Sequence, residues 1–188
     1  MKTAFILHGY NGDTTSTFGP SLKNFLEKKG YNVIMPNFPI RLEASFDNWS
    51  EVLDNYKDLF NESTIVVAHS IGNPFFIKYL SNNKLNAYIY ISVAGFGDLF
   101  KIDNREDLNN AFIDFSINDE HIKYLKENVK NRFSLYGDKD HIIPFNILEN
   151  FPKKIESTPV FIKGIGHMGN RDKVSRLPQI EDIINKLV

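Results

Sequence analysis

The chain has 188 residues, of which 42% are hydrophobic and 24% are charged, and its formal net charge is −1. This length predicts one globular domain over residues 1–188 that buries about 70% of its unfolded surface, so folding needs neither a disulfide nor a metal. The balanced charge and the lack of a Lys/Arg-rich run argue against nucleic-acid binding, and a sequence without cysteine excludes thiol catalysis and thiolate metal sites.

No stretch of the sequence approaches the roughly 20 apolar residues of a membrane span. The apolar run at residues 4–7 is too short for the core of a signal peptide. We therefore expect a cytoplasmic protein with no membrane span.

Short apolar segments typical of buried strands alternate with helical patterns along the chain. The predicted strands are 3–7, 32–35, 64–67, 87–93, 132–136 and 158–162. The predicted helices are 18–29, 46–60, 71–80, 106–115, 120–129 and 178–188. Trp49, in the second helix, is expected in the core. This alternation implies an α/β fold with a six-stranded, mainly parallel sheet, covered by helices on both faces and joined by right-handed crossovers.

The first strand ends in a glycine-containing loop, His8-Gly9-Tyr10. A phosphate-binding role fails here, because the loop contains neither G-x-G-x-x-G nor Gly-Lys-Ser/Thr. A His-Gly loop after the first strand instead fits an oxyanion loop, in which the backbone N–H groups of Tyr10 and Ile71 are the expected donors. His8 itself is interpreted as a loop-shaping residue rather than a base.

A strand, a sharp turn and a helix are predicted over residues 64–79, with Ser70 at the apex of the turn. Ala68, Ser70 and Gly72 form small-x-Ser-x-Gly, a variant of the nucleophile elbow Gly-x-Ser-x-Gly. The helix that begins after Ser70 points free N–H groups and its positive dipole end at the reacting centre. An ordinary buried strand and turn is the alternative, since so short a motif also occurs by chance.

Residues 94–130 break the regular alternation of strands and helices. A long insertion after the carboxyl end of a strand is the expected place for a lid or cap. Phe96, Phe100, Phe112 and Phe115 are candidates for the wall of an apolar substrate pocket over the serine. The alternative is that these aromatic rings pack the insertion onto the sheet.

The carboxyl ends of parallel strands lie along one edge of a sheet, which is where ligands bind. Ser70 follows the third predicted strand, Asp140 the fifth and His167 the sixth, so the three should meet there as nucleophile, acid and base. Asp138 is the rival acid, but Asp140 stands in the Asp-x-x-Ile-Pro turn and is favoured. His141 is the rival base, and His167 is favoured because the acid adjoins His141.

Four motifs carry a resemblance to a known family. They are His8-Gly9-Tyr10, Ala68-His69-Ser70-Ile71-Gly72, Asp140-His141-Ile142-Ile143-Pro144 and Gly166-His167. Together with the pattern Phe46-Asp47-Asn48-Trp49, they resemble the small serine hydrolases of the retinoblastoma-binding-protein and YdeN type over nearly the whole chain. The resemblance implies a compact α/β-hydrolase fold with a triad at Ser70, Asp140 and His167. Ala68 replaces the usual first glycine of the elbow, as it does in similar small hydrolases.

The hypothesis from the sequence is a serine hydrolase that cleaves a small carboxylic ester, thioester or amide through an acyl-serine intermediate. No metal or organic cofactor is implied, because nucleophile and base are protein groups, and the expected partner is a small acyl substrate, with no protein partner indicated. Two alternatives stay open. One is a catalytically silent binding module with the hydrolase fold, and the other is an acyltransferase that uses the same triad.

Overall fold

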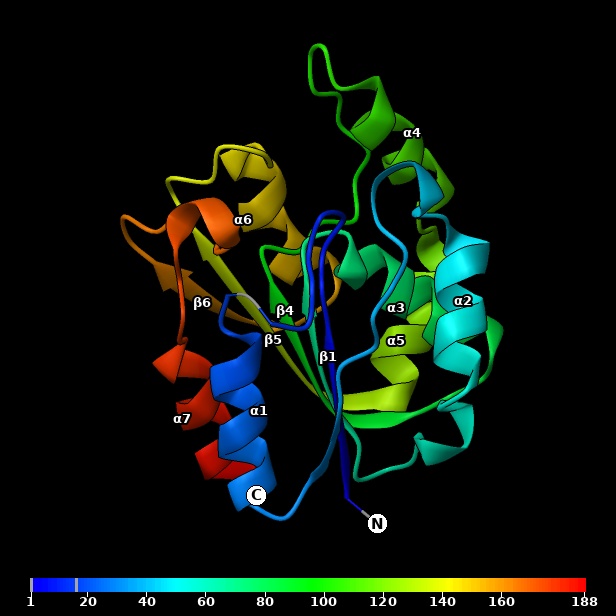
Figure 1. Ribbon diagram of the computed structural model, residues 1–188, viewed down its shortest axis with the longest axis vertical. Helices are drawn as coiled ribbons and strands as arrows, with labels where there is room; N and C mark the ends of the chain where they lie inside the picture. The colour runs from blue at the N-terminus through cyan, green and yellow to red at the C-terminus, as the bar shows by residue number, and fades with distance from the viewer. Residues whose placement is uncertain (1, 16) are drawn as a thin grey trace.

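A six-stranded sheet forms the centre of the computed structural model, which describes residues 2–15 and 17–188 (Figure 1). Its strands are β1 (Thr3–Leu7), β2 (Asn32–Ile34), β3 (Ile65–His69), β4 (Ala87–Val93), β5 (Val129–Gly137) and β6 (Thr158–Ile162). The strand order is β2-β1-β3-β4-β5-β6, and each neighbouring pair is parallel. The prediction of six strands in an α/β-hydrolase-like sheet is confirmed.

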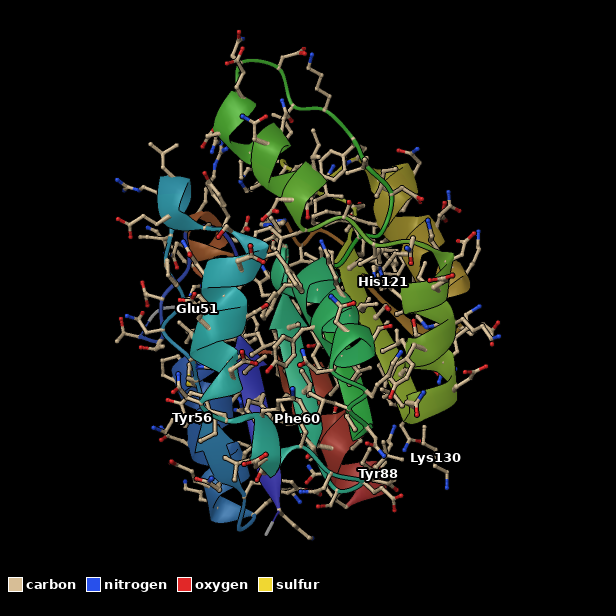
Figure 2. All side chains as sticks on the ribbon, turned by 90° about the vertical axis from the view of Figure 1, so that its right-hand side faces the viewer. Glu51, Tyr56, Phe60, Tyr88, His121 and Lys130 are labelled. Atoms are coloured by element: carbon tan, nitrogen blue, oxygen red, sulfur yellow. The ribbon has the colours of Figure 1, made fainter. Side chains whose placement is uncertain are left out.

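Helices cover both faces of this sheet (Figure 1). They are α1 (Gly19–Lys28), α2 (Phe46–Asp54), α3 (Gly72–Asn82), α4 (Glu106–Asp114), α5 (Asp119–Asn128), α6 (Phe145–Lys154) and α7 (Pro178–Leu187). Helices α1 and α7 lie together on one face, and α2, α3 and α5 lie on the other. Figure 2 shows α3 between α2 and α5. Within the described part of the chain, no helix is both long and apolar enough to cross a membrane.

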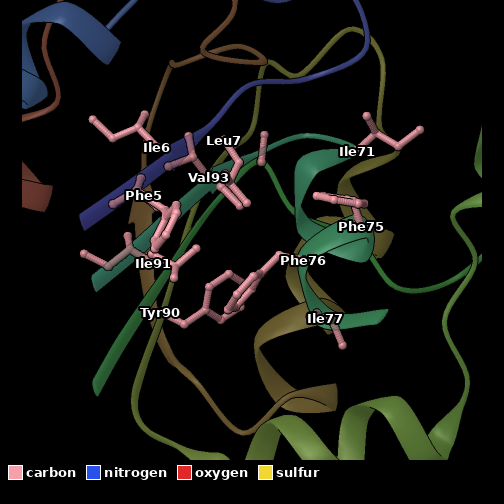
Figure 3. Packing of buried hydrophobic residues seen from close by; sticks show 14 of the residues in the cluster. Phe5, Ile6, Leu7, Ile71, Phe75, Phe76, Ile77, Tyr90, Ile91 and Val93 are labelled. Carbon is pink, nitrogen blue, oxygen red and sulfur yellow. The ribbon is translucent and has the colours of Figure 1, made fainter. Parts of the chain in front are cut away.

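Buried side chains of β3, β4 and α3 form the part of the core beneath the turn that carries Ser70. Every residue of β3 from Ile65 to Ala68 is fully buried. Phe76 of α3 packs on Tyr90 of β4, with 5.1 Å between ring centroids (Figure 3). Burying such an aromatic side chain contributes about 1.5–3 kcal/mol. The elbow therefore rests on a rigid base.

Trp49 of α2 is fully buried, as the sequence predicts. Its ring stacks on Phe38 at 4.4 Å between centroids, and its Nε1–H donates to the carbonyl of Pro39 at 2.7 Å. The helix predicted over 46–60 ends at Asp54, and a short 3₁₀ turn, Lys57–Leu59, follows it.

The insertion 94–130 divides into two parts. Helix α4 lies beyond the carboxyl edge of the sheet, at the top of Figure 1, where a cap is expected. Helix α5 instead packs along α3 on the face of the sheet, as a crossover helix does. The part that reaches the site therefore ends before α5.

Candidate active site

Ser70 occupies a sharp turn between β3 and α3. Its φ of 54° lies in the left-handed region, which costs a residue with a side chain about 1–3 kcal/mol. The turn is held from the neighbouring strand, because the N–H of Ser70 donates to the carbonyl of Val93 at 2.9 Å. The strained serine thus sits where the predicted elbow places it.

Two glycines let the elbow lie close to the end of β1. A Cβ on Gly72 would lie 2.8 Å from the carbonyl oxygen of His8, which is a backbone atom and cannot swing aside. A Cβ on Gly9 would lie 3.0 Å from the Cβ of Ser70. The loop after β1 and the elbow are therefore pressed together, as an oxyanion site built from both requires.

Asn73 braces the elbow from below and was not identified from the sequence. It is fully buried, and its Nδ2 donates to the carbonyls of Ser70 at 2.9 Å and Val93 at 3.2 Å. The hydroxyl of Tyr90 donates to Asn73 Oδ1 at 2.6 Å, and burial raises the pKa of that phenol. The available signal was an amide in the first turn of α3, directly before the apolar run Pro74-Phe75-Phe76-Ile77.

Ser70, His167 and Asp140 form one continuous chain of hydrogen bonds. His167 Nε2 lies 3.0 Å from Ser70 Oγ, and His167 Nδ1 lies 2.7 Å from Asp140 Oδ2. The second carboxylate oxygen, Oδ1, accepts from the N–H groups of Ile142 at 2.8 Å and Ile143 at 2.9 Å. Ser70 and His167 are both buried, and the Asp140 side chain is almost fully so.

The surroundings of Asp140 favour its charged form. Burial alone would raise the pKa of this carboxyl, but the hydrogen bond and charge of His167 and the N–H groups of Ile143 and Ile142 outweigh it. The pKa of Asp140 therefore lies below its ordinary value, and the group is an anion at neutral pH. An anion there favours the tautomer of His167 that carries its proton on Nδ1 and leaves Nε2 free to accept from Ser70.

The two rival residues lie outside this chain of hydrogen bonds. Asp138 Oδ1 accepts from the N–H of Gly164 at 2.5 Å, so it braces a loop at the surface. His141 is exposed, with its ring centroid 6.2 Å from that of His167, and makes no hydrogen bond within the described residues.

His8 is tied into the backbone around it. Its Nδ1 donates to the carbonyl of Gly9 at 2.8 Å, and its Nε2 accepts from the N–H of Phe38 at 3.0 Å. Burial lowers the pKa of His8, which fits the neutral form that these two bonds require. Both nitrogens are occupied, so His8 shapes the loop.

The backbone N–H groups of Tyr10 and Ile71 donate to no partner in the part of the chain that the structure describes. Tyr10 lies in the loop after β1, and Ile71 is the N-cap of α3. The side chain of Tyr10 lies near Asp107 of α4, and burial and the carboxylate of Asp107 raise the pKa of its phenol.

A cavity of about 280 Å³ opens over Ser70 and His167. Much of its wall is apolar, from Leu7, Tyr10, Phe18, Met35, Leu108 and Phe112. Two guanidinium groups also line it, those of Arg105, which is paired with Asp107, and Arg171. Among the described residues, no cluster of three His, Cys, Asp or Glu side chains could hold a metal ion.

Of the four phenylalanines predicted to line the pocket, only Phe112 does so in the described part of the chain. Phe96 and Phe100 pack on Phe112 of α4, at 5.0 Å and 4.8 Å between ring centroids. Phe115 is fully buried against Trp49, at 4.9 Å between centroids. These three rings therefore pack against other side chains and do not line this cavity, in contrast to the expectation from the sequence.

The parallel sheet, the strained serine and the buried Ser–His–Asp chain define the class of α/β-hydrolase-like serine hydrolases. The serine hydrolase family model matches residues 4–186, and the chain belongs to this family.

Comparison with individual proteins agrees with this assignment. YdeN of Bacillus subtilis (strain 168) is 26% identical over 186 residues, which cover 97% of this chain and 94% of YdeN. The crystal structure of the B. subtilis ydeN gene product superposes with a TM-score of 0.86 at 25% identity, over 99% of this chain and 98% of that one. A structure from a study of carboxylesterases of Nitrososphaera gargenis has a TM-score of 0.70 at 13% identity, over 98% and 88% of the two chains, and shows likeness of fold.

Proposed function

We propose that this protein hydrolyses small carboxylic esters, thioesters or amides through an acyl-serine intermediate. The observation that carries the proposal is the chain from Ser70 Oγ through His167 to Asp140, at 3.0 Å and 2.7 Å. Membership of the serine hydrolase family supports hydrolysis as the type of reaction.

In the proposed first half-reaction, Ser70 Oγ attacks the carbonyl carbon of the substrate while His167 Nε2 takes the hydroxyl proton. The tetrahedral oxyanion accepts hydrogen bonds from the N–H groups of Tyr10 and Ile71. Each such donor is worth about 3–4 kcal/mol in the transition state. The imidazolium then gives its proton to the leaving group, and the acyl group stays on Ser70.

In the second half-reaction, water attacks the acyl-serine and His167 Nε2 takes the proton of the water. Collapse of the second tetrahedral intermediate releases the carboxylic acid, and His167 returns the proton to Ser70 Oγ. Asp140 keeps its charge throughout and stabilises the imidazolium in both halves. His167 Nε2 thus accepts the proton from Ser70 in the first half-reaction and the proton from water in the second.

The size of the cavity supports a small acyl substrate. Its volume of about 280 Å³ lies just below the range of about 300–1,000 Å³ that is usual for ligand pockets. Leu108 and Phe112 of α4 form part of its apolar wall, which suits the hydrocarbon part of an acyl group.

The test is turnover of p-nitrophenyl butyrate, a butyryl thioester and a butyryl anilide by wild type and Ser70→Ala. The Ser70→Ala variant should lose on the order of a millionfold in kcat if the triad acts as a unit. Ser175→Ala is the matched control, because Ser175 is exposed and makes no hydrogen bond within the described residues. A Ser70→Ala rate near that of wild type would contradict the proposal.

A further inference from the structure

A second histidine joins the elbow to the loop that carries His167. His69 is the last residue of β3, directly before Ser70, and its backbone pairs with Val93 in the sheet. Nε2 of its side chain lies 2.8 Å from the backbone carbonyl oxygen of His167. The nucleophile and the base are thus connected twice, once through their side chains and once through His69.

The acceptor fixes the tautomer of His69. A carbonyl oxygen can only accept, so Nε2 of His69 must carry the proton. Burial, followed by the charge of His167, lowers the pKa of His69 to about 3, against weaker opposing effects of the His167 carbonyl and Asp140, with His8 lowering it slightly further. His69 is therefore neutral at neutral pH, and Nε2 keeps the proton that it donates to the His167 carbonyl.

The carbonyl that His69 binds belongs to a peptide unit under strain. The next residue, Met168, has a φ of 57° and is fully buried. Gly166 and Gly169 flank His167 and Met168, so the backbone on both sides has more freedom than usual. A left-handed residue that is not glycine persists only where its surroundings hold it.

The other contacts of His167 act on its ring and leave its carbonyl free. Asp140 and Ser70 bind the two ring nitrogens. The N–H of Gly169, two residues after His167, donates to Asp172 Oδ2 at 3.3 Å, and this bond does not involve the His167 carbonyl. Within the described residues, the side chain of His69 is the donor to the His167 carbonyl.

We propose that His69 is a positioning residue for the proposed catalysis, which sets the place of the His167 imidazole by anchoring its backbone carbonyl to the end of β3. This inference rests on the proposed function, since it assigns His69 a role in aligning the base with Ser70. A misplacement of about 1 Å in such a geometry can lower the rate about 100-fold.

The test compares three substitutions that differ in reach and in donor. In His69→Gln the amide nitrogen takes the place of Nε2 and can still donate to the His167 carbonyl. His69→Asn carries the same amide on a shorter side chain, and His69→Phe keeps a ring without a donor. We measure kcat and KM for p-nitrophenyl butyrate, together with the urea midpoint of each variant.

A positioning role predicts that kcat falls about 10- to 100-fold in His69→Asn and His69→Phe, with KM changed by less than about threefold. His69→Gln should stay within about threefold of wild type. The urea midpoint reports separately on folding, so the kcat of a folded but less stable variant remains interpretable.

The outcomes separate the two proposals. Wild type without Ser70-dependent turnover would contradict the proposed function and this inference with it. Ser70-dependent turnover in wild type, with kcat unchanged in a folded His69→Asn or His69→Phe, would overturn the inference alone. A His69→Gln variant as slow as His69→Asn would also overturn it, because the donor would then not be what matters.

Discussion

At the scale of single residues, the site depends on how closely two backbones approach. Gly72 begins α3, where alanine is ordinarily favoured over glycine by about 0.5–1 kcal/mol. The site opposes that preference, because the added Cβ would lie 2.8 Å from the carbonyl oxygen of His8. The steric clash should outweigh the helix preference, because neither the new Cβ nor the carbonyl oxygen of His8 belongs to a flexible side chain.

Gly72→Ala is therefore expected to lower the free energy of unfolding by about 1–3 kcal/mol, the usual cost of overpacking, and to lower turnover. The matched control is Gly30→Ala, since Gly30 has a φ of +82° but open space around it. That change should cost about 1 kcal/mol through backbone strain and leave kcat intact. Urea unfolding and ester turnover measure both, and a Gly72→Ala variant as active and stable as wild type would contradict the close approach.

Asp140 makes a prediction about pH. The pKa of Asp140 is lowered in the folded protein. Its carboxylate therefore stabilises the folded state at pH values above the ordinary pKa of about 3.9. That stabilisation is lost as the pH falls through the lower pKa of the folded state. Asp140→Asn should thus be less stable than wild type at pH 7, and the gap should narrow below about pH 4. Urea unfolding over this range measures the gap, and a gap independent of pH would refute the assignment.

The positions of Ser70, Asp140 and His167 could be predicted from the sequence because each lies in the segment that follows a strand of a parallel sheet. The contacts of His69 and Asn73 could not, since they join side chains to backbone carbonyls whose directions depend on loop conformation. The roles of the three triad residues stay predictions until catalysis is measured.

Among the elements, α4 is held to two helices on the face of the sheet by its last residue, Asp114. Asp114 Oδ2 accepts from the N–H of Phe46, the first residue of α2, at 2.5 Å. Lys78 Nζ of α3 donates to the carbonyl of Asp114 at 2.8 Å. One residue of α4 thus binds two helices of the sheet face, and it satisfies a free N–H at the start of α2.

Asp114→Ala should lower the free energy of unfolding by about 1 kcal/mol, as the loss of a helix cap does. Asp103→Ala removes the same charge from the same segment, at a residue without a hydrogen bond in the described part of the chain, and should stay within about 0.5 kcal/mol of wild type. Urea unfolding of both variants measures the two changes in free energy. Equal changes in Asp114→Ala and Asp103→Ala would contradict a contribution of the hydrogen bond from Asp114 to α2.

The sequence predicted the strands better than the connections between them. Strand bounds agree to within a few residues, even for β6, which is mostly exposed. Helix α6 was not predicted, and Pro152 inside it interrupts a pattern that otherwise has apolar residues at helical spacing. The position of α5 beside α3 depends on packing rather than on the local sequence.

At the scale of the whole molecule, the parallel sheet gathers the site. The ends of β1, β3, β5 and β6 bring the His8-Gly9-Tyr10 loop, Ser70, Asp140 and His167 to one edge, and α4 lies above it (Figure 1). Residues separated by 97 positions in the sequence are thereby joined by one hydrogen bond.

Activation of Ser70 by His167 can be tested by labelling with a fluorophosphonate probe and measuring the intact mass. We expect a single adduct on wild type, none on Ser70→Ala, and a much slower adduct on His167→Ala. An adduct that persists on Ser70→Ala, or a folded wild type that takes none, would contradict it.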